Sequence, residues 1–437
     1  MLRRRAGAAS VPPPAAPAVA AAAAGAGALA AALVAAVVTL LVTALGLAAA
    51  QLLLGEAALD ARVAAAFEAS GARAGLVAPS LLWDKKYGAK DARAGVPRQA
   101  LAADLAALLR PASTDQYALV VGESGTGKST AVRDAVRALP WPKGALYFSA
   151  PEIVTSFSGE LARAVDYAPP FDTLASVLSR LGGQAPATRG AGGVAWPELS
   201  RALQAASARF HAKHGRPAVL IIDAADYVAK KDPAFFADLQ DFAKVCADAG
   251  SLRVVFVSSE GAALPLMRAA SAWSRALPPY EVRDIDDAPA VAYLVGRGVE
   301  SAVAEEAVRT LAGGRFSLLL RVPNAATAAS LAALRRTLDA RTNAVLKGVG
   351  LDPAHALFRA LLADGRLMED AALDLVPAEA LAALLRDNVL ALHPDGAYTV
   401  HARHVERFLA KMAGAAAAPH EPAPAAGGGN AGERPRP

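Results

Sequence analysis

The sequence predicts an α/β fold with a parallel sheet, followed by a helical region and a small C-terminal module. Strand-like apolar runs alternate with helical patterns at residues 117–121, 145–148, 218–222, 253–257 and 280–282. Such alternation is typical of parallel strands joined by crossover helices. Helical periodicity then dominates residues 287–348. In residues 353–411, three helical patterns precede two short strand patterns that flank the turn-forming pair Asp395-Gly396.

The composition is that of a globular protein with a nearly neutral body. The chain has 437 residues, enough for two or three domains of about 150 residues each. Hydrophobic residues make up 54% and charged residues 19%, which excludes a disordered polyampholyte. Three charges of the net +5 are Arg3, Arg4 and Arg5, which leaves +2 for the rest. This balance argues against a protein that coats nucleic acid. The single cysteine, Cys246, excludes an internal disulfide.

The N-terminal region carries an apolar segment long enough to cross a membrane. Residues 28–54 contain no charged side chain. A bilayer requires about 20 apolar residues, so we expect a transmembrane helix here and a single-pass membrane location. Residues 1–27, rich in Ala and Pro, are expected to be disordered, and residues 55–94 to form a helix and a linker. Two alternatives stay open: a transit peptide for a mitochondrion or another organelle, or a secretory signal.

The most specific motif in the chain is Gly122-Glu-Ser-Gly-Thr-Gly-Lys-Ser-Thr130, which fits the pattern G-x-x-x-x-G-K-[ST]. A glycine-rich loop can turn its backbone N–H groups towards a phosphate. Lys128 then meets the β- and γ-phosphates, and the Ser129 hydroxyl can coordinate Mg²⁺. A strand pattern precedes the loop and a helical pattern follows it. We therefore expect ATP and Mg²⁺ as cofactors. The expected binding residues are Gly122, Glu123, Ser124, Gly125, Thr126, Gly127, Lys128, Ser129 and Thr130.

A second acidic element follows about 95 residues after this loop. Residues 218–222 read as a strand buried on both faces, and Asp223 comes directly after them. A carboxylate at the carboxyl end of a parallel strand lies where open α/β sheets bind ligands. Asp223 is therefore the expected second ligand of the Mg²⁺, beside Ser129.

These two elements resemble the Walker A and Walker B motifs of the AAA+ and STAND P-loop ATPases. The body is most similar to the archaeal-type ATPase branch, which is related to origin-recognition-type initiators. The resemblance implies a P-loop core over residues 95–284 and a helical lid over residues 285–348, in which Gly313-Gly314-Arg315 is similar to the lid's glycine turn.

The resemblance also assigns roles to four residues outside the two motifs. Arg98 is expected near the adenine. Ser258 and Ser259 stand at the sensor 1 position, where a polar side chain contacts the γ-phosphate or the attacking water. Arg275 precedes the strand at residue 280, where such ATPases often carry an arginine. If Arg275 acts on a neighbouring subunit, the active form is an oligomer.

One position departs from the AAA+ pattern. AAA+ proteins place Glu directly after the Walker B Asp to orient the water, but Ala224 stands there in this chain. The next acid is Asp226, a spacing that resembles the STAND arrangement, whose members often act as slow switches. Asp226 is the candidate water-positioning base, with Glu260 as the next candidate; the alternative is that Asp226 caps a helix.

The C-terminal module looks like a winged helix over residues 349–412, ahead of an Ala- and Pro-rich tail at 413–437 expected to be disordered. Its third predicted helix carries one base, Arg386, against two acids. A DNA-reading helix normally carries several bases for phosphate contacts. A contact within the chain or with a protein is therefore favoured over DNA recognition. The basic cluster of the module, Arg403, Arg407 and Lys411, lies on its last predicted helix.

Together these features predict a slowly hydrolysing AAA+/STAND-type ATPase that acts as a membrane-anchored nucleotide switch, with a protein partner or a second copy of itself. Two alternatives stay open. One is a DNA-associated initiator or repair ATPase that uses the winged helix. The other is an ATP-bound scaffold that does not hydrolyse, which the Ala224 departure motivates.

Overall fold

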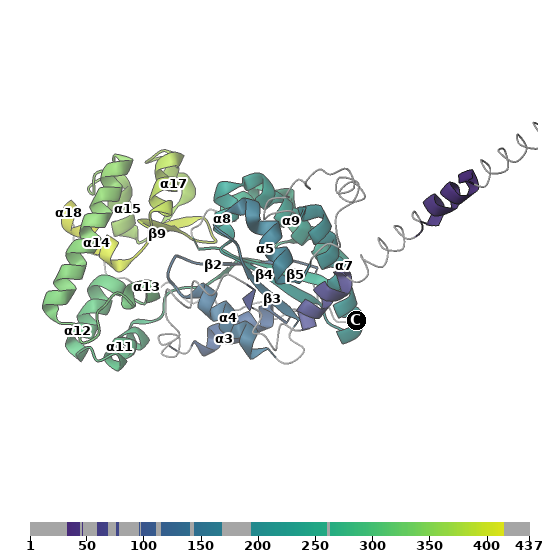
Figure 1. Ribbon diagram of the computed structural model, residues 1–437. Coiled ribbons are helices and arrows are strands. Elements are labelled where there is room, and N and C mark those ends of the chain that lie inside the picture. Colours follow the sequence, from purple (N-terminus) through teal and green to yellow (C-terminus); the bar gives the residue numbers. More distant parts are fainter. Residues whose placement is uncertain are drawn as a thin grey trace, which may run out of the picture. The chain divides into compact units, whose positions relative to one another are not determined.

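The computed structural model describes residues 33–43, 46, 59–68, 76–77, 96, 98–110, 115–139, 144–167, 194–259 and 263–414. Contacts divide the chain into two units. Residues 1–59 with 169–171 form the first, whose described part includes the helix at residues 33–43. The second contains all the sheets and the functional elements discussed below (Figure 1).

The second unit is built on a six-stranded parallel sheet with the strand order β1-β3-β4-β5-β2-β6. This confirms the predicted α/β fold with a parallel sheet. The central strands β2, β4 and β5 are apolar except for Asp223 and Arg253, and all their residues are buried, as is typical of parallel strands. The two-residue strand β1 was not predicted, because a pair of apolar residues carries no periodicity. The strands are β1 Leu76–Val77, β2 Ala118–Val121, β3 Ala145–Ser149, β4 Ala218–Asp223, β5 Leu252–Val257 and β6 Tyr280–Glu281.

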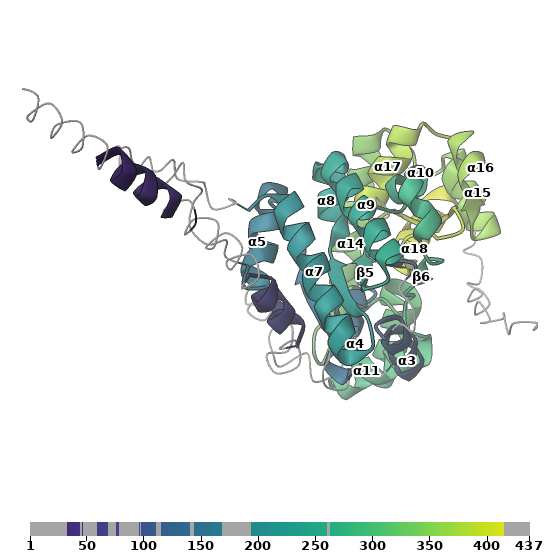
Figure 2. The ribbon, with the colours of Figure 1, turned by 90° about the vertical axis from the view of Figure 1, so that its right-hand side faces the viewer.

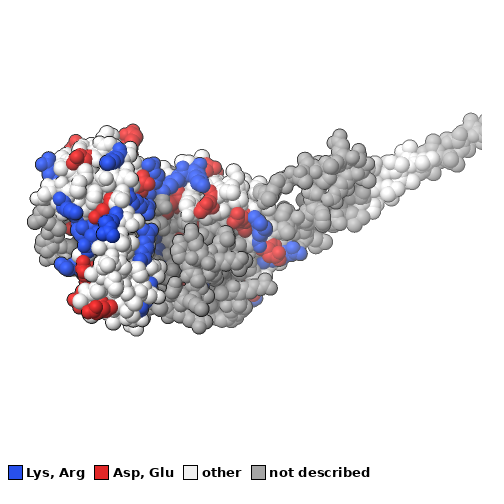
Figure 3. Space-filling view, turned by 60° about the vertical axis from the view of Figure 1, so that its left-hand side comes forward, with Lys and Arg blue, Asp and Glu red and all other residues white. Residues whose placement is uncertain are grey.

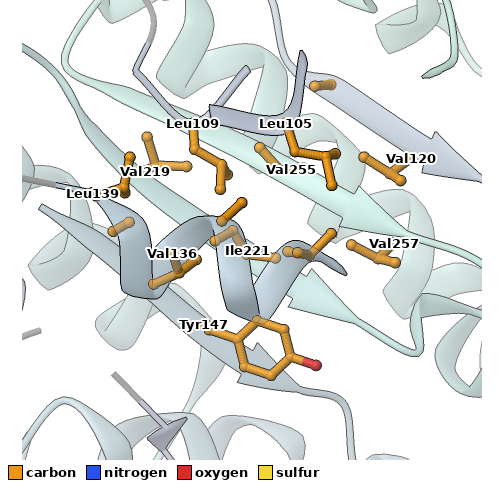
Figure 4. Close-up of a cluster of buried hydrophobic side chains, with 14 of the residues drawn as sticks. Leu105, Leu109, Val120, Val136, Leu139, Tyr147, Val219, Ile221, Val255 and Val257 are labelled. Atoms are coloured by element: carbon orange, nitrogen blue, oxygen red, sulfur yellow. The ribbon is translucent and has the colours of Figure 1, made fainter. Parts of the chain in front are cut away.

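Helices cover both faces of this sheet (Figures 1 and 2). On one face, α3 and α4 pack their leucine and valine side chains on alternate residues of β2, β4 and β5 (Figure 4). On the other face lie α5, α7 and α9, where Phe236 of α9 packs edge-to-face on Phe256 of β5. These helices are α3 Gln99–Leu108, α4 Lys128–Ala138, α5 Phe157–Ala164, α7 Trp196–His214 and α9 Pro233–Ala249.

Because the strands are parallel, their carboxyl ends meet at one edge of the sheet. Strand β2 ends there at Val121, directly before the glycine-rich loop, and β4 ends at Asp223. Strand β5 ends at Val257, directly before Ser258. The fold thus gathers the loop, Asp223 and Ser258 at the edge where open α/β sheets bind ligands.

Two smaller groups of elements follow the sheet. The helical region, which we define as α11 to α14, has its own apolar core. The C-terminal module, which we define as α15 to α18, combines four helices with a three-stranded antiparallel sheet in the order β7-β9-β8. The first group comprises α11 Asp287–Gly296, α12 Ser301–Ala307, the π-helical turn η4 Val308–Ala312, α13 Phe316–Leu319 and α14 Ala328–Val349. The second comprises α15 Ala356–Asp364, β7 Leu367–Met368, α16 Glu369–Leu373, α17 Ala378–Arg386, β8 Leu390–Leu392, β9 Ala397–Val400 and α18 Arg403–Ala413.

The prediction of a membrane-spanning helix, and with it of a membrane location, is wrong. In the described part of the chain, no helix is both long and apolar enough to cross a bilayer. Within residues 28–54 the structure describes Gly46 and residues 33–43, which are helical. The other residues of that segment lie outside the described residues, as do residues 1–27 and 415–437.

Candidate functional site

The glycine-rich loop joins β2 to α4 and ends on a buried lysine. Gly127 adopts a φ of 89° immediately before α4, a left-handed conformation that favours glycine. Lys128, the first residue of α4, is 3% exposed, and its Nζ donates a hydrogen bond to the Glu123 carbonyl at 2.6 Å. Burial lowers the pKa of Lys128 to about 8, although the nearby carboxylates of Asp226 and Asp223 favour its charge.

The loop also contacts the helical region directly. The N–H of Ser317 in α13 donates to the Gly125 carbonyl at 3.1 Å. A Cβ atom at Gly125 would overlap the Ser317 side chain, so this close approach requires glycine. The Arg98 side chain donates to the Thr126 carbonyl at 3.1 Å and to the Arg283 carbonyl at 2.6 Å. Arg98 therefore ties the loop to the segment that follows β6.

Asp223 lies at the end of β4 and is 4% exposed. Its Oδ1 accepts a hydrogen bond from the Ala224 N–H at 2.8 Å, and its Oδ2 accepts one from the Tyr147 hydroxyl. Burial and Asp223 raise the pKa of the Tyr147 hydroxyl, whereas the nearby Ser129 side chain lowers it. The structure therefore brings the two expected metal ligands, Ser129 and Asp223, to a common neighbour. A hydroxyl and a carboxylate are the oxygen ligands that suit Mg²⁺, so the residues present fit this ion.

Asp226 does not cap a helix. The residue before α8 (Ala225–Lys231) is Ala224, and its side chain makes no capping bond. The Asp226 carboxylate instead reaches across to the end of β5. It accepts hydrogen bonds from the Ser258 hydroxyl at 2.7 Å and from the Ser259 N–H at 2.5 Å. The left-handed backbone of Ala224, with a φ of 56°, turns the chain sharply between Asp223 and Asp226.

Arg275 is not brought to the site. It is the last residue of the short helix η3 (Ser271–Arg275), and its side chain is exposed and paired with Asp248 at 2.6 Å. Its carbonyl accepts a hydrogen bond from the N–H of Tyr117, which precedes β2. The glycine-rich loop follows the opposite end of the same strand. Glu260 lies outside the described residues.

Arg315 was not predicted as a site residue, yet its guanidinium contacts the loop, Asp284 and the C-terminal module. It is 2% exposed and precedes α13. Its guanidinium forms ion pairs with Glu123 in the loop and with Asp284, the latter at 2.6 Å. It also donates to the Ser124 carbonyl at 3.3 Å. Burial disfavours the charge of Arg315, but Glu123 and Asp284 outweigh this effect and raise its pKa.

The same guanidinium contacts His401, which follows β9 in the C-terminal module. It donates to the His401 carbonyl at 2.7 Å and lies 2.8 Å from the ring Nε2. Burial, reinforced by the charge of Arg315, holds the pKa of His401 well below its ordinary value. The imidazole is therefore neutral at physiological pH and can accept a hydrogen bond from Arg315.

A pocket opens where the loop faces the C-terminal module. Its core side is formed by the loop and by the end of β5, and its other side by α17, the following turn and β8. The lining residues include Gly122, Glu123, Ser258, Ser259, Leu385, Asn388, Leu390 and His401. Lys128, Ser129 and Asp223 do not line this pocket, which brings part of the loop and the end of β5 against the C-terminal module.

Comparisons with known proteins agree with this geometry. Residues 96–257 match the family described as AAA ATPase domain, a span that includes the loop, Asp223 and Asp226. No curated protein matches the chain significantly.

Solved structures that align with the chain include the Walker-type ATPase PABY2304 of Pyrococcus abyssi, with 16% identity and a TM-score of 0.46. That alignment covers 72% of this chain and 96% of the other. Cdc6p from Pyrobaculum aerophilum aligns with 13% identity and a TM-score of 0.34, over 73% and 96% of the two chains. The Aeropyrum pernix ORC1 protein, solved in complex with DNA, aligns with 13% identity and a TM-score of 0.35, over 73% and 94%. Residues 96–257 thus match an AAA ATPase domain, and the parallel sheet is that of the α/β P-loop NTPase fold.

Proposed function

We propose that this protein is an ATP-binding, slowly hydrolysing switch of the AAA+/STAND type. In this proposal, the bound nucleotide controls the contact between the P-loop core, the helical region and the C-terminal module. The observation that carries the proposal is the position of Arg315. One buried guanidinium contacts the glycine-rich loop at Glu123, belongs to the helical region directly before α13, and binds His401 of the C-terminal module.

In the proposed site, Lys128 holds the β- and γ-phosphates, and the loop N–H groups surround them. Ser129 and Asp223 hold Mg²⁺, which when bound neutralises charge on the phosphates. Two observations support this arrangement. The buried ammonium of Lys128 lies near the carboxylates of Asp223 and Asp226, and the proposed metal ligands Ser129 and Asp223 both lie beside the Tyr147 hydroxyl. Asp226 orients the attacking water, and Ser258 and Ser259 orient Asp226 through their two hydrogen bonds. With Ala224 in place of a glutamate, we expect slow turnover.

The switch step follows from the chemistry of Arg315. A guanidinium binds a terminal phosphate in the same forked geometry as a carboxylate. We infer that the γ-phosphate becomes a further anionic partner of Arg315, which then holds His401 and its module against the core. Hydrolysis removes that partner and weakens the contact, as in other switches that respond to a γ-phosphate.

We further propose that the C-terminal module is a winged helix that acts within the chain rather than on DNA. Its hairpin turn packs on the core, where Arg268 donates to the Pro394 carbonyl and His393 pairs with Glu281. On the face that carries α14 and α18, Figure 3 shows Lys and Arg side chains with Asp and Glu among them. Two of the three bases of α18 are held in ion pairs, Arg403 with Asp287 and Arg407 with Asp339.

Two finer possibilities rest on single observations. Arg275 is exposed and lies at the far end of β2 from its own loop, so it could serve only a neighbouring subunit. This supports self-association. Ala224 supports a second candidate function, an ATP-bound scaffold that does not hydrolyse.

The direct test of the proposed function compares the unaltered chain with Lys128→Ala and Asp223→Ala. We expect Lys128→Ala to lose nucleotide binding, because Lys128 is the one cation within the loop at residues 122–130. Asp223→Ala should abolish steady-state phosphate release. Equal nucleotide affinity and turnover in Lys128→Ala would contradict the loop assignment. An unaltered chain that binds ATP but releases no phosphate would favour the scaffold.

A further inference from the structure

Tyr147 stands between the two proposed metal ligands, although no motif marks it. It lies on β3, next to β4 in the sheet, and pairs in register with Ile221. Asp223 is two residues further along β4, so its side chain lies diagonally across from Tyr147 on the same face. A tyrosine is long enough to span that diagonal, and its hydroxyl donates to Asp223 Oδ2.

Two hydrogen-bond donors hold the Asp223 carboxylate in its orientation. The Ala224 N–H holds Oδ1 and belongs to the backbone of the next residue. The Tyr147 hydroxyl holds Oδ2 and comes from another strand. Tyr147 is therefore the side chain that sets the rotation of this carboxylate.

The ring of Tyr147 is itself firmly placed. It is 6% exposed and belongs to the apolar cluster with Val132, Val136 and Ile221. Figure 4 shows the ring at the margin of this cluster, with its hydroxyl oxygen pointing away from it. Because a tyrosine has only two rotatable side-chain bonds, packing of the ring also determines where the hydroxyl lies.

We propose that Tyr147 is a positioning residue that orients Asp223, and through it the divalent cation, in the nucleotide site. The inference rests on the proposed function, because it concerns the cation held by Ser129 and Asp223. Partners that orient a metal ligand typically change metal affinity about 10- to 100-fold when they are removed. A purely structural tyrosine would instead affect folding and leave the cation dependence unchanged.

The test titrates free Mg²⁺ against binding of a fluorescent ATP analogue to the full chain, in EDTA and across a concentration series. The variant is Tyr147→Phe, and the matched control is Tyr280→Phe. Tyr280 packs on the same cluster and also donates to a carboxylate, Asp104, at 2.7 Å. We expect Tyr147→Phe to bind the analogue in EDTA as the unaltered chain does. The Mg²⁺ concentration at the midpoint of its titration should be higher by about 10-fold or more. Tyr280→Phe should keep the midpoint of the unaltered chain.

Each outcome decides the inference. An unchanged Mg²⁺ midpoint in Tyr147→Phe, or an equal shift in Tyr280→Phe, would overturn it. If Tyr147→Phe lowers thermal stability, the variants are compared in an Asp223→Asn background, where the effect of Tyr147→Phe on Mg²⁺ should vanish. A shift that persists there would also overturn the inference. Failure of the unaltered chain to bind the analogue at any Mg²⁺ concentration would instead reject the proposed function.

Discussion

The buried carboxylate of Asp226 changes how the sensor position is interpreted. The resemblance to AAA+ proteins places Ser258 and Ser259 against the γ-phosphate or the water. In the structure, both donate to Asp226, which is 3% exposed. A buried carboxylate requires such donors. At the level of single residues, Ser258 and Ser259 thus hold the carboxylate of the candidate base, Asp226.

We therefore predict that Ser258→Ala slows ATP turnover without weakening ATP binding. Asp226 would lose one of its two donors, and a hydrogen bond to a charged group contributes about 1.5–3 kcal/mol. The expected loss in kcat is about 10- to 100-fold, measured by phosphate release at saturating ATP. In the double variant with Asp226→Ala, removing the hydroxyl should have no further effect. A full additional loss there would place Ser258 on the nucleotide instead.

Local sequence patterns predict only part of this site. The loop, Lys128 and Asp223 follow from spacing within short segments, because their neighbours in sequence build their geometry. Arg315 lies 192 positions from Glu123, and Tyr147 lies 76 positions from Asp223. Such contacts depend on which strands and helices meet, so no local pattern predicts them. For Arg315, the preceding pair Gly313-Gly314 was the available signal, since a Cβ atom at Gly314 would clash with the Ile285 backbone.

At the level of elements, the β8–β9 hairpin joins the C-terminal module to the core through a titratable contact. His393 Nδ1 lies 2.5 Å from Glu281 Oε1, and its Nε2 lies 2.8 Å from Thr399 Oγ1. Burial alone would lower the pKa of His393, but Glu281, with help from Glu123 and Asp395, raises it above 6.5. Burial opposes ionisation of Glu281, yet His393 and Arg283 lower its pKa below 4.5.

These shifts predict a pH-dependent contribution to stability. The His393 contribution is complete below the unfolded pKa of 6.5 and is lost as the pH rises through the raised folded value. The Glu281 contribution is present above 4.5 and is lost as the pH falls through the lowered folded value. The pair should therefore stabilise the protein most between pH 4.5 and 6.5.

The measurement is denaturant unfolding of the unaltered chain and His393→Gln across this range and up to about pH 9. We expect an advantage for the unaltered chain on the order of 1 kcal/mol in the acidic window, shrinking at alkaline pH. The matched control is His211→Gln on α7, which removes a histidine but leaves the contact between His393 and Glu281 in place. A difference that grows with rising pH would contradict the ion pair.

At the scale of the whole molecule, the prediction of a membrane span from composition was wrong, whereas the prediction of a parallel sheet from the order of strands and helices was confirmed. The apolar run at residues 28–54 met the length criterion for a membrane span, but no described helix there is long enough to cross one. The parallel sheet was predictable, because alternating strand and helix patterns constrain connectivity.

A contact of the C-terminal module within the chain or with a protein was favoured from its few basic residues. The residues that make the contact with the core could not be predicted, since they belong to distant segments. Arg315 connects these surfaces, and the account as a whole depends on it. Loss of its side chain should lower the affinity for ATP more than that for ADP, because it removes the proposed partner of the γ-phosphate. Lys128 and the loop stay in place, so the variant should still bind either nucleotide at saturating concentration. It should nevertheless remove the link from the loop to His401.

Hydrogen–deuterium exchange of the β8–β9 segment tests this link most directly, in the unaltered chain and in Arg315→Ala, with ATP·Mg²⁺ and with ADP·Mg²⁺. The account predicts that ATP slows exchange in residues 390–401 of the unaltered chain relative to ADP. In Arg315→Ala, which should still bind both nucleotides, the two exchange rates should be equal. The same difference between ATP and ADP in both proteins, or none in an unaltered chain with ATP bound, would contradict the claim that Arg315 transmits the nucleotide state.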